Sequence, residues 1–256
     1  MNKGLFDIRP WVLPIALLVV WEVIVRLNIV SASLFPSPVS ILITGWELMV
    51  SGELTKHIFA SLSRAVAGMI IGGLIGFVLG IINGLFDKSF AFLDSTIQMI
   101  RNVPHLALLP LVIVWFGIGE DAKIFLVVIG VMFPVYVNTL HGIRNVDPQL
   151  VEMGRMYNLK GWKLFKDILF PGALPSIFVG LRYALGVMWL TLIVAETIPT
   201  QVGIGYLATN AREFMQTDVI VLSIIIYALL GKLADLTAKI GEDRALKWNA
   251  SYNKDL

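Results

Sequence analysis

The chain has 256 residues, of which 57% are hydrophobic and 15% charged, and its net charge is +2. So large an apolar share excludes an ordinary water-soluble domain, and so small a net charge provides no basic face for nucleic acid. The sequence contains no cysteine, which excludes disulfides, thiolate metal sites and cysteine nucleophiles. Charged residues gather in short segments between long apolar runs, as in loops between membrane spans. We therefore expect an all-α, polytopic membrane protein.

A membrane span needs about 20 apolar residues, because a helix rises 1.5 Å per residue and the hydrocarbon layer is roughly 30 Å thick. The sequence predicts six spans within a single transmembrane domain, residues 1–256. The six apolar runs lie near residues 11–25, 65–86, 103–118, 124–140, 177–198 and 219–236. Between the first two, an amphipathic stretch at residues 39–50 is expected to lie along the outer membrane interface.

The third span contains Pro104 and Pro110, and each proline removes a helix hydrogen bond. We expect this span to be bent, broken or tilted. Two interpretations stay open: a simple proline kink, or a broken span whose freed backbone groups line a transport pathway.

Glycines recur every four residues along the second span, which places them on a slowly winding stripe of one helix face. Small residues let another helix approach closely, and such contact drives association in lipid. We expect the stripe to be a packing surface, with a sliding or hinge surface as the alternative. Its members are Gly68, Gly72, Gly76, Gly80 and Gly84.

The distribution of lysine and arginine predicts the orientation, because cytoplasmic connections carry the excess. Fourteen of these residues lie in the two tails and in the second and fourth connections, against four in the remaining connections. Both termini are therefore expected in the cytoplasm.

Four polar residues in or near the spans are candidates for the substrate pathway: Asn102, His105, Arg182 and Glu196. Arg182 either extends its guanidinium back to the interface or meets an anionic substrate. Glu196 either borders a gate or, as we expect, contacts water outside. His105 either acts as a proton relay or makes an ordinary polar contact.

The fourth connection, residues 141–176, contains five basic residues and the aromatic residues Tyr157, Trp162 and Phe165. It ends with Pro171-Gly172, which is expected to stop a helix before the next span. It predicts two short amphipathic helices separated near Gly161 that lie across the cytoplasmic face and dock a partner. Glu152-Met153-Gly154, Asn158 and Ile168-Leu169-Phe170-Pro171 resemble the EAA loop of bacterial ABC importer permeases, written E-A-A-x3-G-x9-I-x-L-P. Met153 and Gly154 replace the alanines, Asn158 the glycine and Phe170 the leucine. Asn158 can still adopt a left-handed conformation.

Further blocks resemble the aliphatic sulfonate subfamily of these permeases, which also includes permeases for taurine, nitrate and thiamine precursors. They are Ile97–His105, Trp115–Ile118, Phe133–Tyr136, His141–Asn145 and Trp189–Glu196. The resemblance implies a multi-pass permease of the bacterial cytoplasmic membrane that translocates aliphatic sulfonates. It implies a homodimer, two cytoplasmic ATPase subunits that use ATP and Mg, and an external solute-binding protein. The coupling residues would be Glu152, Met153, Gly154, Asn158, Ile168, Phe170 and Pro171.

Two other classes are disfavoured by the residues. An ion-coupled secondary transporter should show several acidic or histidine residues deep in the spans or an inverted repeat, and neither is evident. An intramembrane enzyme would need a catalytic or metal-binding cluster, whereas the three histidines lie far apart in sequence. No nucleotide-binding glycine loop occurs. We therefore expect no catalytic residue, bound cofactor, metal or nucleic-acid partner for this chain.

Overall fold

A computed structural model of the protein describes residues 9–31, 33–198 and 200–249. Over these residues all secondary structure is helical, which confirms the predicted all-α class. The elements are α1 (Arg9–Arg26), α2 (Pro38–Val50), α3 (Glu53–Leu85), α4 (Asp87–Arg101), the 3-10 helix η1 (His105–Leu108), α5 (Leu109–Phe116), α6 (Glu120–Arg144), α7 (Pro148–Met156), α8 (Trp162–Leu164), the π-helical turn η2 (Phe165–Leu169), α9 (Phe170–Ala195), α10 (Ile204–Glu213) and α11 (Thr217–Ala245).

Four of the described helical stretches are long and apolar enough to cross a membrane: α3, α6, α11 and the continuous stretch Trp162–Ala195. A fifth is formed if α4 and His105–Phe116, which meet at a bend of 78°, count as one span. The first predicted span is helical. However, the 18 residues of α1 include three charged residues, Arg9, Glu22 and Arg26, so this helix is not apolar enough to count among the spans. A sixth span therefore stays a prediction.

The third predicted span is broken, as its prolines indicate. α4 ends at Arg101, η1 begins at His105 after Pro104, and Pro110 lies in the first turn of α5, where a missing N–H costs little. The predicted limits of 103–118 were too narrow. The amphipathic helix α4, placed in a connection by its charge content, forms the other arm of the bend.

Three further spans extend beyond their predicted limits. α3 begins at Glu53, α11 ends at Ala245, and the stretch that contains α9 begins at Trp162. The added turns contain charged residues, so an apolar run marks only the middle of each helix. The amphipathic α2 lies where residues 39–50 predicted a helix, whereas α10 was not predicted.

The chain divides into two compact units, and the prediction of a single domain stays untested. The first unit comprises the residues up to Ala60 and Gln201–Tyr227. Within it, the Thr44 hydroxyl donates to Asp218 at 2.6 Å, and the N–H of Gly203 donates to Nδ1 of His57 at 3.0 Å. These bonds join α2 to the start of α11, and the start of α3 to the turn before α10.

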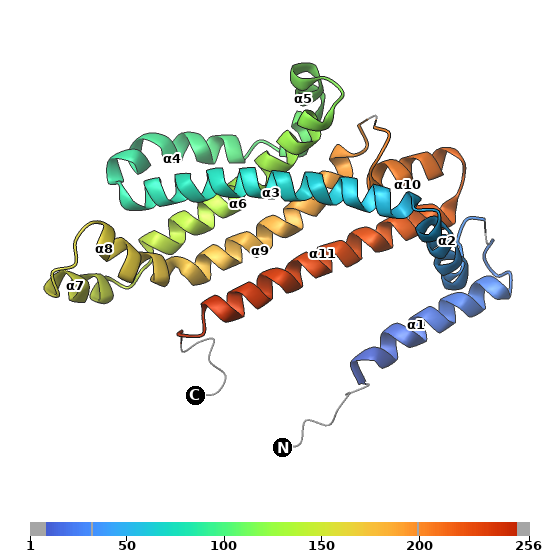
Figure 1. The fold of residues 1–256 in the computed structure, drawn as a ribbon, viewed down its shortest axis with the longest axis horizontal. Coiled ribbons are helices and arrows are strands. Elements are labelled where there is room, and N and C mark those ends of the chain that lie inside the picture. The colour runs from blue at the N-terminus through green and yellow to red at the C-terminus, as the bar shows by residue number, and fades with distance from the viewer. Residues whose placement is uncertain (1–8, 32, 199, 250–256) are drawn as a thin grey trace. The chain divides into compact units, whose positions relative to one another are not determined.

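The second unit comprises Ser61–Thr200 and the residues from Ala228 onward. α6 lies at its centre, with α3 along one side and α9 along another (Figure 1). All five glycines of the predicted stripe face α6: a Cβ atom on Gly72 would lie 2.5 Å from the carbonyl oxygen of Val128, and one on Gly76 would overlap that of Met132. On the α9 side, a Cβ on Gly142 would lie 2.9 Å from the carbonyl oxygen of Ala173. The three helices thus meet backbone to backbone.

Replacing Gly76 by alanine tests this contact, with Gly73 of the same helix as the control. The added methyl at Gly76 collides with the backbone of α6, whereas a Cβ on Gly73 meets no atom within 4 Å. Overpacking of this kind costs about 1–3 kcal/mol, so G76A should lower the midpoint of thermal unfolding in detergent. G73A should leave it unchanged or raise it, since alanine favours helix. Equal midpoints for the two variants would contradict the packing described.

Candidate functional site

The helix α7 lies in the connection that resembles the EAA loop. Asp147 caps it by accepting a hydrogen bond from the N–H of Gln149 at 2.9 Å, and Pro148 occupies its first turn. After α7 ends at Met156, Asn158 adopts a left-handed conformation with φ +64°, as expected for the residue at this position. The chain can therefore reverse direction between α7 and α8.

Two residues of the EAA resemblance are in contact. Gly154 is buried, and a Cβ atom there would overlap the Cδ1 atom of Ile168 and lie 3.0 Å from that of Leu164. A larger residue at position 154 would push α7 away from the π-helical turn. Glu152 and Met153 lie on the exposed part of α7 and belong to no such contact.

The second half of this connection differs from the prediction. No separate second helix ends at Pro171-Gly172, because α8, η2 and α9 form one continuous helix from Trp162 to Ala195. The N–H of Phe170 donates to the carbonyl oxygen of Phe165, five residues back, so the turn just before Pro171 is widened. A widened turn has room for a proline ring, which also has no N–H to donate. Phe170 packs against Phe165 and Phe77 in the core between α9 and α3.

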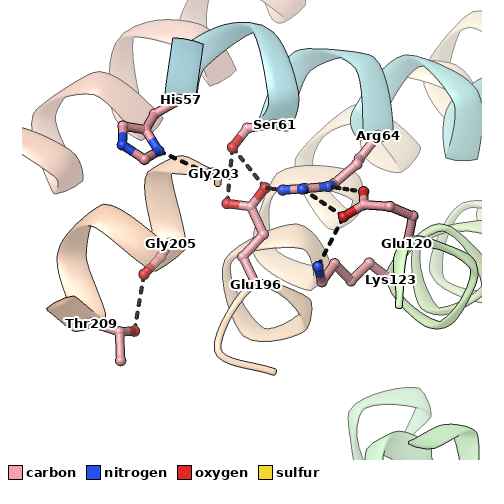
Figure 2. Close-up of polar contacts among 9 residues, drawn as sticks. All are labelled: His57, Ser61, Arg64, Glu120, Lys123, Glu196, Gly203, Gly205 and Thr209. Atoms are coloured by element: carbon pink, nitrogen blue, oxygen red, sulfur yellow. Dashed lines mark hydrogen bonds and ion pairs between the residues drawn. The ribbon is translucent and has the colours of Figure 1, made fainter. Parts of the chain in front are cut away.

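A group of ionic side chains, the Arg64 cluster, joins α3 and the beginning of α6 to the end of α9 (Figure 2). Its members are buried except for Glu120, which is exposed. Arg64 donates to Glu196 at 2.6 Å and to Glu120 at 2.8 Å, and the Ser61 hydroxyl donates to Glu196 at 2.7 Å. Lys123 donates to Glu120 at 3.1 Å. The side chain of Glu196 is 0% exposed, so the expectation that Glu196 contacts water is wrong. It was wrong because the partner, Arg64, lies 132 residues away in sequence.

Arg182 also has carboxylate partners. Its guanidinium donates to Asp235 at 3.0 and 3.1 Å and lies 3.3 Å from Glu242. Both acids belong to α11, so the contact joins α9 to α11. In this structure the charge of Arg182 is occupied by protein groups, and neither interface snorkelling nor substrate contact is needed to explain its position.

His105 lies beside a cavity of about 310 Å³ between the broken span, α6 and α9. The Nε2 atom of His105 is 2.9 Å from the Thr191 hydroxyl. Of the four pathway candidates, only His105 lines this cavity; Asn102 follows the lining residue Arg101 and is exposed. The polar lining residues that sequence reasoning missed are Arg101, Asn138 and Tyr183. The position of Arg101 beside the Pro104 break was the one signal available for them.

Within residues 9–31, 33–198 and 200–249, no group of three or more His, Asp or Glu side chains is placed to hold a metal ion. What the geometry provides is a set of spans, a helix exposed beside them and a polar cavity between them.

Two relatives match the chain over most of its length. It is 56% identical over 253 residues to the aliphatic sulfonates transport permease protein SsuC of Escherichia coli (strain K12), a match that covers 99% of this chain and 96% of that protein. It is 34% identical over 238 residues to the taurine transport system permease protein TauC of the same strain, with 91% and 86% covered.

A solved structure shares the fold. The crystal structure of an amino acid ABC transporter with histidines superposes with a TM-score of 0.63 and covers 79% of this chain and 96% of that chain. The sequence identity is 18%, so this likeness concerns the fold alone.

A protein family also matches the larger part of the chain. Residues 68–247, which include the broken span, α7 and the cavity, match the family described as binding-protein-dependent transport system inner membrane component. With its apolar helices, the protein is a multi-pass inner membrane protein. The chain belongs to this family of inner membrane components of binding-protein-dependent transport systems.

Proposed function

We propose that this chain is the permease subunit of an ATP-driven importer and that it carries aliphatic sulfonates. The observation that carries the substrate class is the identity of 56% to a permease named for aliphatic sulfonates, against 34% to one named for taurine. The machine has a second copy of the permease, two ATPase subunits that bind ATP and Mg, and an external binding protein that delivers the ligand. The alternative substrates are taurine, nitrate or a thiamine precursor.

The helix α7 docks on the ATPase from the cytoplasmic side. Together with Tyr157, which follows it, the helix exposes apolar side chains that a water-exposed connector does not need: Met153 is 46% exposed, and Met156 and Tyr157 are 88% and 78% exposed. Glu152 lies beside them on the outer surface of the helix. The buried face of α7 touches Ile168 through Gly154, so movement of α7 is transmitted directly to the Trp162–Ala195 helix.

The Arg64 cluster lies at the opposite end of the same helix. With both termini cytoplasmic, as the lysine and arginine distribution favours, that end faces outward. We assign to Glu196 a structural role there, because its carboxylate is saturated by Arg64 and Ser61. The cluster holds the outer ends of α3, α6 and α9 together.

An ion-coupled secondary transporter is the weaker alternative. Its pathway would need titratable groups that exchange protons or ions, and the buried acids Glu196 and Glu242 are instead bound to arginines. Paired in this way, they are poor candidates for ion coupling.

The first test is uptake into proteoliposomes that contain this chain with its ATPase and binding protein. A labelled alkanesulfonate should enter only with ATP, and an excess of taurine or nitrate should not compete. Uptake that persists without ATP and follows an ion gradient would contradict the ATP-driven importer and support the ion-coupled secondary transporter. Strong inhibition by taurine or nitrate would replace the substrate class and leave the machine intact.

Replacing Glu152 by alanine should abolish ATP-dependent uptake while the protein still reaches the membrane. The physical reason is that α7 loses its charged contact with the ATPase. Co-purification of the ATPase with the tagged permease measures the docking directly and should fall in parallel. The matched control is E213A, because Glu213 is exposed on α10; a loss of uptake in that variant, or normal uptake in E152A, would contradict the docking role.

Replacing Glu196 by leucine should destabilise the protein, whereas E196Q should lie between E196L and the wild type. Leucine leaves the Nη1 atom of Arg64 and the Ser61 hydroxyl without their acceptor, at a cost on the order of 3 kcal/mol for a broken buried pair. Glutamine keeps one acceptor oxygen in place. Thermal unfolding in detergent gives the order, and an E196L midpoint equal to that of the wild type would show that the pair holds nothing together.

A further inference from the structure

The cavity beside the broken span is lined by a positively charged side chain, and none of its lining residues is acidic. Arg101 ends α4, and its side chain lines the cavity together with His105, which opens η1 after the break. Asn138 of α6 and Tyr183 of α9 line it from the other helices. Three segments of the second unit therefore converge on this volume.

Arg101 differs from three other arginines of the spans. Arg64, Arg144 and Arg182 each pair with at least one carboxylate. Throughout the part of the chain that the structure describes, no ion pair or hydrogen bond of the Arg101 side chain is found. An arginine within a membrane-spanning segment needs an anionic partner or water. The space in front of this one is a cavity and not a protein carboxylate.

His105 is held in place to face the same cavity. The Thr191 hydroxyl lies 2.9 Å from Nε2, and a Cβ atom on Gly130 would lie 3.4 Å from that nitrogen. When the hydroxyl donates to Nε2, the ring proton resides on Nδ1, which is then a donor for an anion. Gly130 leaves room for the imidazole, so the ring orientation depends on both α6 and α9.

The rest of the lining is apolar. Phe133, Val137 and Val187 supply a surface for an alkyl chain, and no aspartate or glutamate is among the lining residues. A cavity of about 310 Å³ lies at the small end of ligand sites. It suits a short, singly charged amphiphile: a polar head for the guanidinium and a short apolar tail.

We propose that this cavity is the permease's own binding site for an alkanesulfonate during translocation. Arg101 donates to the sulfonate oxygens, whose fixed, spread negative charge matches a planar guanidinium. His105 contributes a second donor, and the alkyl tail lies against Val137 and Val187. The inference rests on the function proposed above and adds a source of selectivity. The ammonium group of taurine finds no carboxylate here, and nitrate has no tail to bury.

The test uses the full transporter in proteoliposomes with one binding protein for all variants, so that any change in preference comes from the permease. R101Q should lower ATP-dependent uptake of a labelled alkanesulfonate about tenfold or more, as expected for a lost charged hydrogen bond. Its thermal midpoint and its ATPase stimulation by the binding protein should match the wild type. R212Q, which removes an exposed arginine of α10, should transport normally.

A second variant tests the tail contact. V187F shortens the apolar side of the cavity. The ratio of inhibition by short alkanesulfonates to inhibition by long ones should therefore rise about tenfold relative to the wild type. An unchanged chain-length preference, normal uptake in R101Q, or an R101Q protein that loses stability or ATPase stimulation would each overturn the proposal. Failure of the proposed function is a separate result, since it would appear as a wild-type protein without ATP-dependent sulfonate uptake.

Discussion

Backbone contact between α3 and α6 is the constraint on which the second unit depends. Helices in lipid gain little by burying apolar side chains against each other, so association requires close van der Waals approach. Gly72 and Gly76 bring the two backbones into contact, and Gly142 does the same between α6 and α9. Once α6 is fixed on two sides, the ends of these helices have defined neighbours. The Arg64 cluster and the cavity both form where those ends and faces meet.

Several arginines of the spans form ion pairs with carboxylates. Arg64 and Arg182 would each be costly in hydrocarbon alone, and each lies against carboxylates from another helix. These pairs favour the observed neighbours of each helix, because a different arrangement would leave the buried Arg64 and the partly exposed Arg182 without their carboxylate partners. Arg101 differs from these two arginines, because its side chain lines a cavity that contains no aspartate or glutamate. Pairing thus separates Arg64 and Arg182, which hold helices together, from Arg101, which lines a cavity.

Much of the fold was readable from the sequence for identifiable reasons. Hydropathy located the middle of each long span, and the four-residue spacing of glycine gave the face of α3 that contacts α6. Pro104 and Pro110 predicted the break, and Asn158 the left-handed turn after α7. These are local signals, and each depends on one or two residue types at a short spacing.

Two kinds of feature could not be predicted from the sequence: contacts between residues far apart in the chain, and short helices that mix polar with apolar residues. Glu196 was assigned to water because nothing near it in sequence reveals Arg64. α4 and α10 escaped notice because a short amphipathic helix has neither a long apolar run nor a strong stop signal. For the site, His105 was identified, whereas Asn138 and Tyr183 belong to the cavity only through the packing of α6 on α9.

The continuity of the Trp162–Ala195 helix has a mechanical consequence. Its 34 residues form a rod about 50 Å long, with the α7 contact at Ile168 near one end and Glu196 just past the other. A rod of this length is a lever: a tilt of about 5° displaces its far end by about 4 Å. Under the docking of α7 proposed above, force applied there would be passed along this helix to the Arg64 cluster at its other end. The cavity borders this helix through Tyr183 and Val187, so a tilt of the helix moves part of the cavity lining.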